Sequence, residues 1–389
     1  MLALNSADCF NFMPSSKPIE MPQSNRLISL DALRGLTIIA MIIVNTPGSW
    51  SAAYAPLCHA EWQGCTPTDL VFPFFLFIMG FSLFLSTQNR LDKGASKRQL
   101  LIHLARRSAL IFLIGVLLYM FPFTNIANFR ILGVLQRIAL VNFFCGLMLL
   151  YASRNFRLYT GGLILIGYWI LLAFIPSPLA GTPSLAYETN WVAWLDQLVL
   201  GKHTWPAMPL MDPEGILSTL PAIVTGLLGI EIAHYFTETQ DKTKKAVILF
   251  LAGFLLTAAG LAWSPVFPFI KKLWTSSYVL YTAGLASMTL GAFYWLIDYM
   301  KKDNYTGLLV AFGKNPLVLY VGSELLIMII WLFPVFGQDK KPLIEYFFNS
   351  LVNAGMSPNN ASLAWAVAYT SVFAVIAWIL YKKKIVIKL

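Results

Sequence analysis

Long apolar runs separated by short polar segments make up most of this chain. A run of about 17–25 apolar residues is long enough to cross the hydrocarbon core of a bilayer as a helix. About ten such runs occur, at residues 29–46, 68–88, 100–121, 133–151, 159–175, 215–236, 245–262, 275–298, 311–333 and 361–381. The pattern therefore predicts an all-α polytopic membrane protein with about ten transmembrane helices.

The composition supports this prediction and excludes a soluble core of this size. Of the 389 residues, 58% are hydrophobic and only 12% are charged, and the mean hydropathy is +0.67. A soluble domain is roughly a quarter charged. The net charge of +10 does not indicate nucleic-acid binding, because the basic residues lie in short clusters between apolar runs, where they usually set membrane topology.

These basic clusters alternate along the chain and predict an orientation. One set of loops and ends carries Lys17, Arg26, Arg90, Lys93, Lys97, Arg98, Arg154, Arg157, Lys242, Lys244, Lys245, Lys301, Lys302, Lys382, Lys383, Lys384 and Lys388. The alternate set carries only Arg130, Lys202, Lys271, Lys272, Lys340 and Lys341. Because basic loops stay in the cytoplasm, we expect both termini to be cytoplasmic. The loop around residue 59 and the segment 176–212 are then outside, the latter as a cap.

The first 26 residues are polar and contain three prolines, without the apolar stretch of a signal peptide. We expect residues 1–26 to be a polar tail, and translation could begin at Met1 or at Met21. Residues 27–389 are expected to form a single transmembrane domain.

The short loop between the first two apolar runs holds the most promising chemistry. It contains His59, and Asp69 follows ten residues later at the start of the next run. A carboxylate at the edge of a membrane span needs a partner or a function, and imidazole is suited to proton transfer near neutral pH. We expect Asp69 to hold His59, although Asp69 could simply cap its helix and His59 could be solvated. Cys58 and Cys65 could form a disulfide or remain two separate thiols.

Two further polar side chains lie near the outer ends of predicted spans. The amide of Asn45 could orient His59 or stabilise an oxyanion, or it could only end the first helix. Arg137 lies about one turn inside the fourth span and needs a partner, for which Asp69 and Glu214 are candidates.

Three arginines lie on the predicted cytoplasmic side. Arg106 and Arg107 begin the third span, and Arg34 lies near the start of the first. Guanidinium groups match phosphate geometry, so these residues could bind a polyanionic cofactor. Positive charge that sets topology would explain them equally well.

The sequence Asp212-Pro213-Glu214-Gly215 is typical of a helix start. It also brings two carboxylates to the outer face that holds His59. The chain contains no zinc motif, Walker loop or nucleophile elbow, and we predict no metal site.

A series of motifs follows in a fixed order from Arg26 to Glu324. The central block contains Leu30-Asp31-Ala32-Leu33-Arg34-Gly35, Val44-Asn45, His59-Ala60-x-Trp62-x-Gly64 and Asp69-Leu70-Val71-Phe72-Pro73-x-Phe75-x-Phe77-Ile78-Met79-Gly80. Further motifs are Gly133-Val134-Leu135-Gln136-Arg137, Asp212-Pro213-Glu214-Gly215, Leu273-Trp274-Thr275-x-Ser277-Tyr278, Asn315-Pro316-Leu317 and Tyr320-Val321-Gly322. Together they resemble the heparan-α-glucosaminide N-acetyltransferase family, polytopic membrane acyltransferases with lysosomal and bacterial members.

The resemblance implies that acetyl moves from cytoplasmic acetyl-CoA, across the membrane, to the amine of a glucosamine unit on the far side. It implies a catalytic role for His59, with Asn45 and Asp69 around it. Acetyl-CoA would be held by Arg34, Arg106, Arg107 and Arg137, and the amino-sugar acceptor by Glu61, Trp62, Asp212 and Glu214. For a bacterial member, the location would be the inner membrane among lipids, with no nucleic-acid partner, and by analogy a homodimer.

Two other functions remain open at this stage. An amino-sugar secondary transporter would use Asp69, Arg137 and Glu324 as coupling groups. A cell-envelope O-acyltransferase would keep the chemistry and change the acceptor from an amine to a hydroxyl. The chain also has no counterpart of the long lumenal N-terminal region of the lysosomal members, which leaves the acceptor open.

Overall fold

The computed structural model describes residues 27–122, 126–337 and 340–387. The polar tail expected at 1–26, with its two candidate start residues, therefore lies outside the described residues. The described part is helical throughout, with one isolated β-bridge between Phe336 and Lys341. The α-helices are α1 (Ile28–Asn45), α2 (Pro67–Asp92), α3 (Lys97–Met120), α4 (Val134–Tyr151), α5 (Arg154–Phe174), α6 (Trp191–Val199), α7 (Ile216–Glu238), α8 (Lys242–Trp263), α9 (Ser276–Phe293), α10 (Gly307–Lys314), α11 (Pro316–Leu332), α12 (Leu343–Asn353) and α13 (Pro358–Lys382).

The expected transmembrane helices are present. Within the described ranges, nine helices are long and apolar enough to cross a membrane, and the pair α10 and α11 brings the number to ten if it counts as one span. Each of the ten predicted apolar runs coincides with one of these elements. The all-α polytopic prediction is confirmed.

The ninth predicted span, 311–333, is not one continuous helix. It breaks at Asn315, where α10 and α11 meet at an angle of 82°. Pro316 follows directly, and proline disfavours helical backbone at the residue before it and cannot donate a backbone hydrogen bond. The span predicted there is therefore present as a bent pair of helices, and the Asn-Pro pair is the physical reason for the bend.

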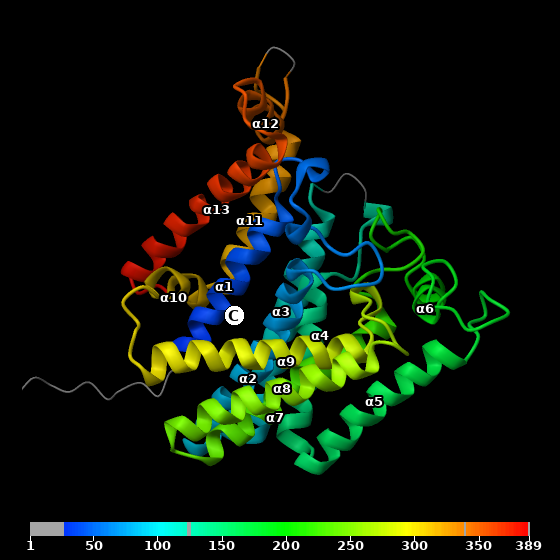
Figure 1. The fold of residues 1–389 in the computed structure, drawn as a ribbon, viewed down its shortest axis with the longest axis vertical. Helices are drawn as coiled ribbons and strands as arrows, with labels where there is room; N and C mark the ends of the chain where they lie inside the picture. Colours follow the sequence, from blue (N-terminus) through cyan, green and yellow to red (C-terminus); the bar gives the residue numbers. More distant parts are fainter. Residues whose placement is uncertain (1–26, 123–125, 338–339, 388–389) are drawn as a thin grey trace, which may run out of the picture.

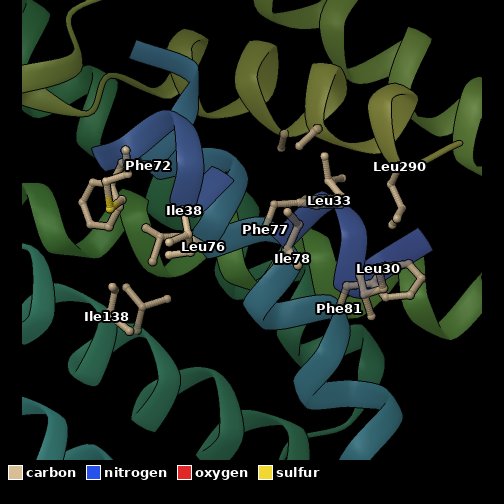
Figure 2. Close-up of a cluster of buried hydrophobic side chains, with 14 of the residues drawn as sticks. Leu30, Leu33, Ile38, Phe72, Leu76, Phe77, Ile78, Phe81, Ile138 and Leu290 are labelled. Carbon is tan, nitrogen blue, oxygen red and sulfur yellow. The ribbon is translucent and has the colours of Figure 1, made fainter. Parts of the chain in front are cut away.

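Helices α2, α7 and α9 pack against one another in the core, and α1 packs on α2 and α9. Helix α8 lies beside α9 (Figure 1). In the most apolar stretch of α7, 78% of the residues are buried, against 22% for α8, so α7 is central and α8 faces the lipid. Figure 2 draws side chains of α1, such as Leu33 and Ile38, together with Phe77 and Leu76 of α2 in this core.

Small residues let the central helices approach closely. A Cβ atom on Gly80 of α2 would collide with the carbonyl oxygen of Gly226 in α7, and one on Gly229 would collide with that of Phe77. Small residues at membrane helix crossings permit this backbone contact. The close crossing of α2 and α7 fixes the start of α2, on which the site described below is built.

The segment 176–212 forms a cap that contains α6, seen to one side of the bundle in Figure 1. Its apolar side chains pack on the end of α5 and on the turn before α9. The buried members of this cluster are Tyr168, Leu172, Val192, Ala193, Met208, Met211, Phe267, Ile270 and Leu273. The cap and that turn thus form one packed unit beside the loop that holds His59.

Candidate active site

The start of α2 builds a His–Asp pair. Thr66 is the N-cap residue, and Asp69 is the third helical residue of a capping box. Oδ2 of Asp69 accepts hydrogen bonds from the backbone N–H groups of Thr66 (3.0 Å) and Ala60 (3.1 Å). Oδ1 is left for Nδ1 of His59, at 2.7 Å. The expected contact between the two residues is present, and Asp69 serves both the helix start and the imidazole.

This geometry determines which nitrogen of His59 is available. An ionised carboxylate can only accept, so Nδ1 of His59 carries the proton and Nε2 is left with a lone pair. The side chain of Asp69 is 1% exposed, whereas that of His59 is 42% exposed. The pair therefore has a buried acid end and an accessible basic nitrogen, the arrangement expected of a general base.

A third charged group, which the sequence interpretation missed, completes the pair. Nζ of Lys271, in the short helical turn η4 (Lys271–Leu273), lies 3.0 Å from Nδ1 and 3.3 Å from Nε2 of His59. It also lies 3.5 Å from Oδ1 of Asp69. The signal was visible in the sequence, because Lys271 and Lys272 are two of only six basic residues on the predicted outer side.

The turn that carries Lys271 is fastened to the His59 loop at several points. The backbone N–H of Gly64 donates to Phe269 (2.8 Å), and Nζ of Lys272 donates to the carbonyl oxygen of Glu61 (2.7 Å). Trp274 adopts a left-handed conformation (φ 55°) that turns the chain into α9. One turn into α9, the hydroxyl of Tyr278 donates to the carbonyl oxygen of Asp69 (2.5 Å).

Burial shifts the ionisation of the groups around the pair. Desolvation lowers the pKa of Lys271, although the charges of Asp69 and Glu214 act in the opposite direction. Burial raises the pKa of the Cys65 thiol to about 12. Cys58 and Cys65 are both free thiols in the structure.

Two of the predicted acceptor-binding residues help to fasten the loop. The indole N–H of Trp62 donates to the carbonyl oxygen of Leu185 in the cap (3.1 Å), and its ring meets Tyr187 edge to face. Glu61 is exposed, and its backbone accepts the bond from Lys272. Trp62 thus joins the His59 loop to the cap, and the Glu61 carboxylate extends toward solvent.

Asp212 and Glu214 form a buried ion cluster with Arg130, another residue that the sequence interpretation missed. Nε of Arg130 donates to Asp212 Oδ2 (2.7 Å), and one Nη donates to Asp212 Oδ1 (2.5 Å) and also to Glu214. Burial would raise the pKa of Glu214, but the positive charges of Arg130, Arg137 and Lys271 outweigh it and lower that pKa. Glu214 therefore links this cluster electrostatically to the His59 site.

Of the two partners expected for Arg137, Glu214 interacts with it through charge, whereas Asp69 contacts His59 and Lys271 instead. The Arg137 guanidinium donates to the Ser218 hydroxyl (2.5 Å) and the Gly215 carbonyl oxygen (3.3 Å), and it lies 5.0 Å from the centre of the Trp274 ring. The Glu214 carboxylate itself accepts a hydrogen bond from Arg130. Arg137 thus also supports the start of α7 and the Trp274 turn.

Asn45 lies at the end of α1, and its amide donates to Glu324 of α11 (3.1 Å) rather than to His59. It lines a pocket of about 360 Å³ formed by the chain after α1 and by α11 and α12, together with Trp50, Trp331 and Glu345. The prediction that Asn45 orients His59 is not supported by this contact.

The three arginines expected to bind a cofactor fall into two groups. Arg34 donates to Asp31 (3.1 Å), to the Gly313 carbonyl oxygen (3.3 Å) and to the Ser82 hydroxyl, where α1, α2 and α10 cross. Arg106 and Arg107 are exposed on α3. Arg34 is thus part of a helix crossing, and the other two are available at the surface.

Comparison with known proteins agrees with this geometry. The family model described as "Heparan-alpha-glucosaminide N-acetyltransferase, catalytic" matches residues 26–260. The chain belongs to this family.

Two members named heparan-alpha-glucosaminide N-acetyltransferase, from Homo sapiens and Mus musculus, are 30% and 29% identical to the chain over 416 and 419 aligned positions. The alignments cover 92% and 93% of the chain. The chain spans about 59–60% of the length of these two relatives.

The family match includes both members of the His59–Asp69 pair and the whole Arg130 cluster. Lys271 lies beyond its end at residue 260. In the part of the chain that the structure describes, no group of three or more His, Cys, Asp or Glu side chains gathers in a way that could hold a metal ion.

Proposed function

We propose that this family member is a transmembrane N-acetyltransferase that moves an acetyl group from cytoplasmic acetyl-CoA to the amine of a glucosamine-type sugar on the outer side. The observation that carries the proposal is the His59–Asp69 pair, in which Nδ1 is bound at 2.7 Å and 42% of the His59 side chain is exposed. Membership of a family whose relatives are named N-acetyltransferases supports the reaction class.

The chemistry needs a base because the nitrogen of the attacking neutral amine must lose a proton as it bonds to the acetyl carbon. Nε2 of His59 takes a proton from the acceptor nitrogen, and Asp69 holds the imidazole and stabilises the imidazolium that forms. The same imidazolium then returns the proton to the departing sulfur. General-base catalysis of this kind contributes typically 10²–10⁴-fold to the rate.

The donor would approach from the opposite side of the membrane. Its phosphates suit the exposed guanidinium groups of Arg106 and Arg107, and its extended arm would carry the thioester toward His59. Arg34, at its crossing of α1, α2 and α10, would line the entry. We propose an inner-membrane location with both termini in the cytoplasm, for which the distribution of basic residues is the support.

The first test is acetyl transfer by the purified protein in detergent, with labelled acetyl-CoA and glucosamine. We expect labelled N-acetylglucosamine from the wild type and a loss of at least about 10²-fold for His59→Ala, with binding of CoA unchanged. A hydroxyl-only acceptor run in parallel distinguishes an O-acyltransferase. Sugar uptake into proteoliposomes without acetyl-CoA, and no transfer to any amino sugar, would reject the enzyme in favour of a transporter.

A further inference from the structure

Lys271 has no role in the reaction proposed above, although it lies in the site. Its ammonium contacts both members of the pair, 3.0 Å and 3.3 Å from the two His59 nitrogens and 3.5 Å from Asp69 Oδ1. Its side chain is 18% exposed and that of His59 is 42% exposed. The lysine head thus lies against the imidazole, nearly equidistant from its two nitrogens, and is only partly exposed.

The contacts with the two nitrogens cannot be equivalent. Nδ1 donates its proton to Asp69 and has no lone pair left, so an ammonium N–H can be accepted only by Nε2. That nitrogen is the atom that takes the acceptor's proton. When it does so, that ammonium N–H loses its acceptor, while the contact with Asp69 Oδ1 at 3.5 Å remains. The freed N–H is then available, beside the protonated imidazole, to a carbonyl oxygen of the donor.

Other cationic or amide groups near the loop are committed elsewhere. Lys272 donates to the Glu61 carbonyl oxygen, and Asn45 donates to Glu324. Arg137 is 1% exposed, on the far side of the Trp274 ring. Within the described ranges, Lys271 is the cation in contact with His59.

We propose that Lys271 is a catalytic residue whose ammonium stabilises the negative charge that develops on the acetyl oxygen during transfer. This inference rests on the proposed acetyltransferase function. It assigns to Lys271 the role of oxyanion stabilisation that the sequence suggested for Asn45. Charge stabilisation of this type acts in a site where water is largely excluded and the donor is already in position.

In the first step, the acceptor nitrogen uses its lone pair to form the C–N bond, and the carbonyl π electrons move to the acetyl oxygen. The acceptor's proton passes to Nε2 of His59. Lys271 donates a hydrogen bond to that oxygen and remains protonated throughout. When the oxygen's electron pair re-forms the carbonyl, the C–S bond breaks, and His59 protonates the departing sulfur.

The turn around Lys271 keeps the ammonium in place before the substrates arrive. Phe269 and Lys272, on either side of it, are bonded to Gly64 and Glu61 of the His59 loop. Positioned donors of this kind contribute about 10²–10³-fold to kcat when they face an oxyanion. Loss of Lys271 should therefore lower kcat rather than weaken binding.

The test compares Lys271→Met and Lys271→Arg in the full-length protein, with Lys202→Met, an exposed lysine of the cap on the same predicted side, as the control. We expect Lys271→Met to lower kcat by about 10²–10³-fold, with KM for acetyl-CoA and glucosamine within about threefold of wild type. Lys271→Arg should retain part of kcat. Lys202→Met, which has no contact with the pair or with its turn, should keep kcat within about threefold.

The pH profile separates this role from simple support of the loop. His59, Asp69, Cys65 and Glu214 face Lys271, and burial lowers its pKa below the ordinary value of about 10.5. As the pH rises, wild-type kcat should therefore begin to fall below pH 10.5. The rate of uncatalysed thioester hydrolysis is subtracted at each pH. In Lys271→Arg, the fall should move to higher pH, because guanidinium stays charged.

Each outcome decides the proposal. A folded Lys271→Met variant with kcat within threefold of wild type would overturn it, and so would an alkaline limb that is identical in wild type and Lys271→Arg. If both variants fail to fold, a wild-type profile that stays flat to pH 10.5 overturns it as well. An inactive wild type would instead reject the proposed function, so the two failures are distinguishable.

Discussion

Asp69 uses its two carboxylate oxygens for two different tasks. Oδ2 accepts from the backbone N–H of Thr66, the N-cap of α2, and from that of Ala60 in the His59 loop, and Oδ1 accepts from His59. One side chain therefore begins a helix and holds the imidazole, so the helix-cap interpretation of Asp69 and its expected contact with His59 are both correct. The consequence is that stability and activity are linked at this residue.

Asp69→Asn tests this link. The amide cannot accept at both positions, so the imidazole loses its orientation, and kcat/KM for acetyl transfer should fall by about 10²–10⁴-fold. Ser96→Ala is the matched control, because Ser96 forms the other capping box, at α3. It should lose about 1 kcal/mol of stability and keep its kcat/KM; equal activity losses in the two variants would argue against a catalytic role for Asp69.

Cys65 allows a second test at the same scale. Burial raises the pKa of its thiol to about 12, so only about one molecule in 10⁴ carries the reactive thiolate at pH 8. We expect iodoacetamide to modify Cys65 far more slowly in the native protein than in protein unfolded with detergent. Peptide mass spectrometry measures both rates. Equal rates in the two states would contradict the burial.

An intact mass two units lower, restored by reductant, would reveal a Cys58–Cys65 disulfide in the native protein.

At the scale of the helices, the sequence predicted what depends on local composition. A run of about twenty apolar residues must be a helix in a bilayer, because every backbone polar group needs an internal partner there. The ten predicted runs therefore coincide with helices. The break at Asn315 was predictable in principle from Pro316, but hydropathy alone does not distinguish a broken span from a continuous one.

Pairings between distant segments were not predictable in this way. Arg130 is bound by Asp212 and Glu214, more than eighty residues away in the chain. Arg130 and Lys271 are both among the six basic residues on the predicted outer side, which marks them as unusual there, but that position does not identify their partners. Their roles depend on which loops the packing of the cap brings together, and this is a property of the tertiary structure.

The crossing of α1 with α10 gives a prediction at the element scale. A Cβ atom on Gly313 would collide with the carbonyl oxygen of Asp31, and backbone atoms cannot move aside as a flexible side chain can. Gly313→Ala should therefore destabilise the protein by about 1–3 kcal/mol. Loss of the monodisperse gel-filtration peak on heating in detergent would measure this.

Gly162→Ala is the control for that experiment. Gly162 lies within α5 and has open space around its Cβ position, so alanine there should be neutral or stabilising through its better helix propensity. A Gly313→Ala variant as stable as the Gly162→Ala variant would mean that α10 is free to shift away from α1.

For the whole molecule, the direction of each helix follows from the number of crossings. If the nine long helices and α11 each cross the membrane, the chain makes ten crossings, because α10 lies at 82° to α11 and adds none. An even number returns the chain to the side on which it started. The loop around His59 and the hairpin of α12 then share one side, consistent with the bond between Tyr54 and Asn360 at the start of α13 (2.6 Å).

The charge distribution specifies which side this is, and cysteine labelling can test it. Lys202 in the cap and Lys244 at the start of α8 are both exposed, and basic residues concentrate at the ends that include Lys244. With the other cysteines replaced by serine, a membrane-impermeant maleimide should label Lys202→Cys in intact cells and Lys244→Cys only after permeabilisation. The reverse pattern would place His59 in the cytoplasm, on the same side as acetyl-CoA. Transfer across the membrane would then be wrong, although the His59–Asp69–Lys271 chemistry could still operate.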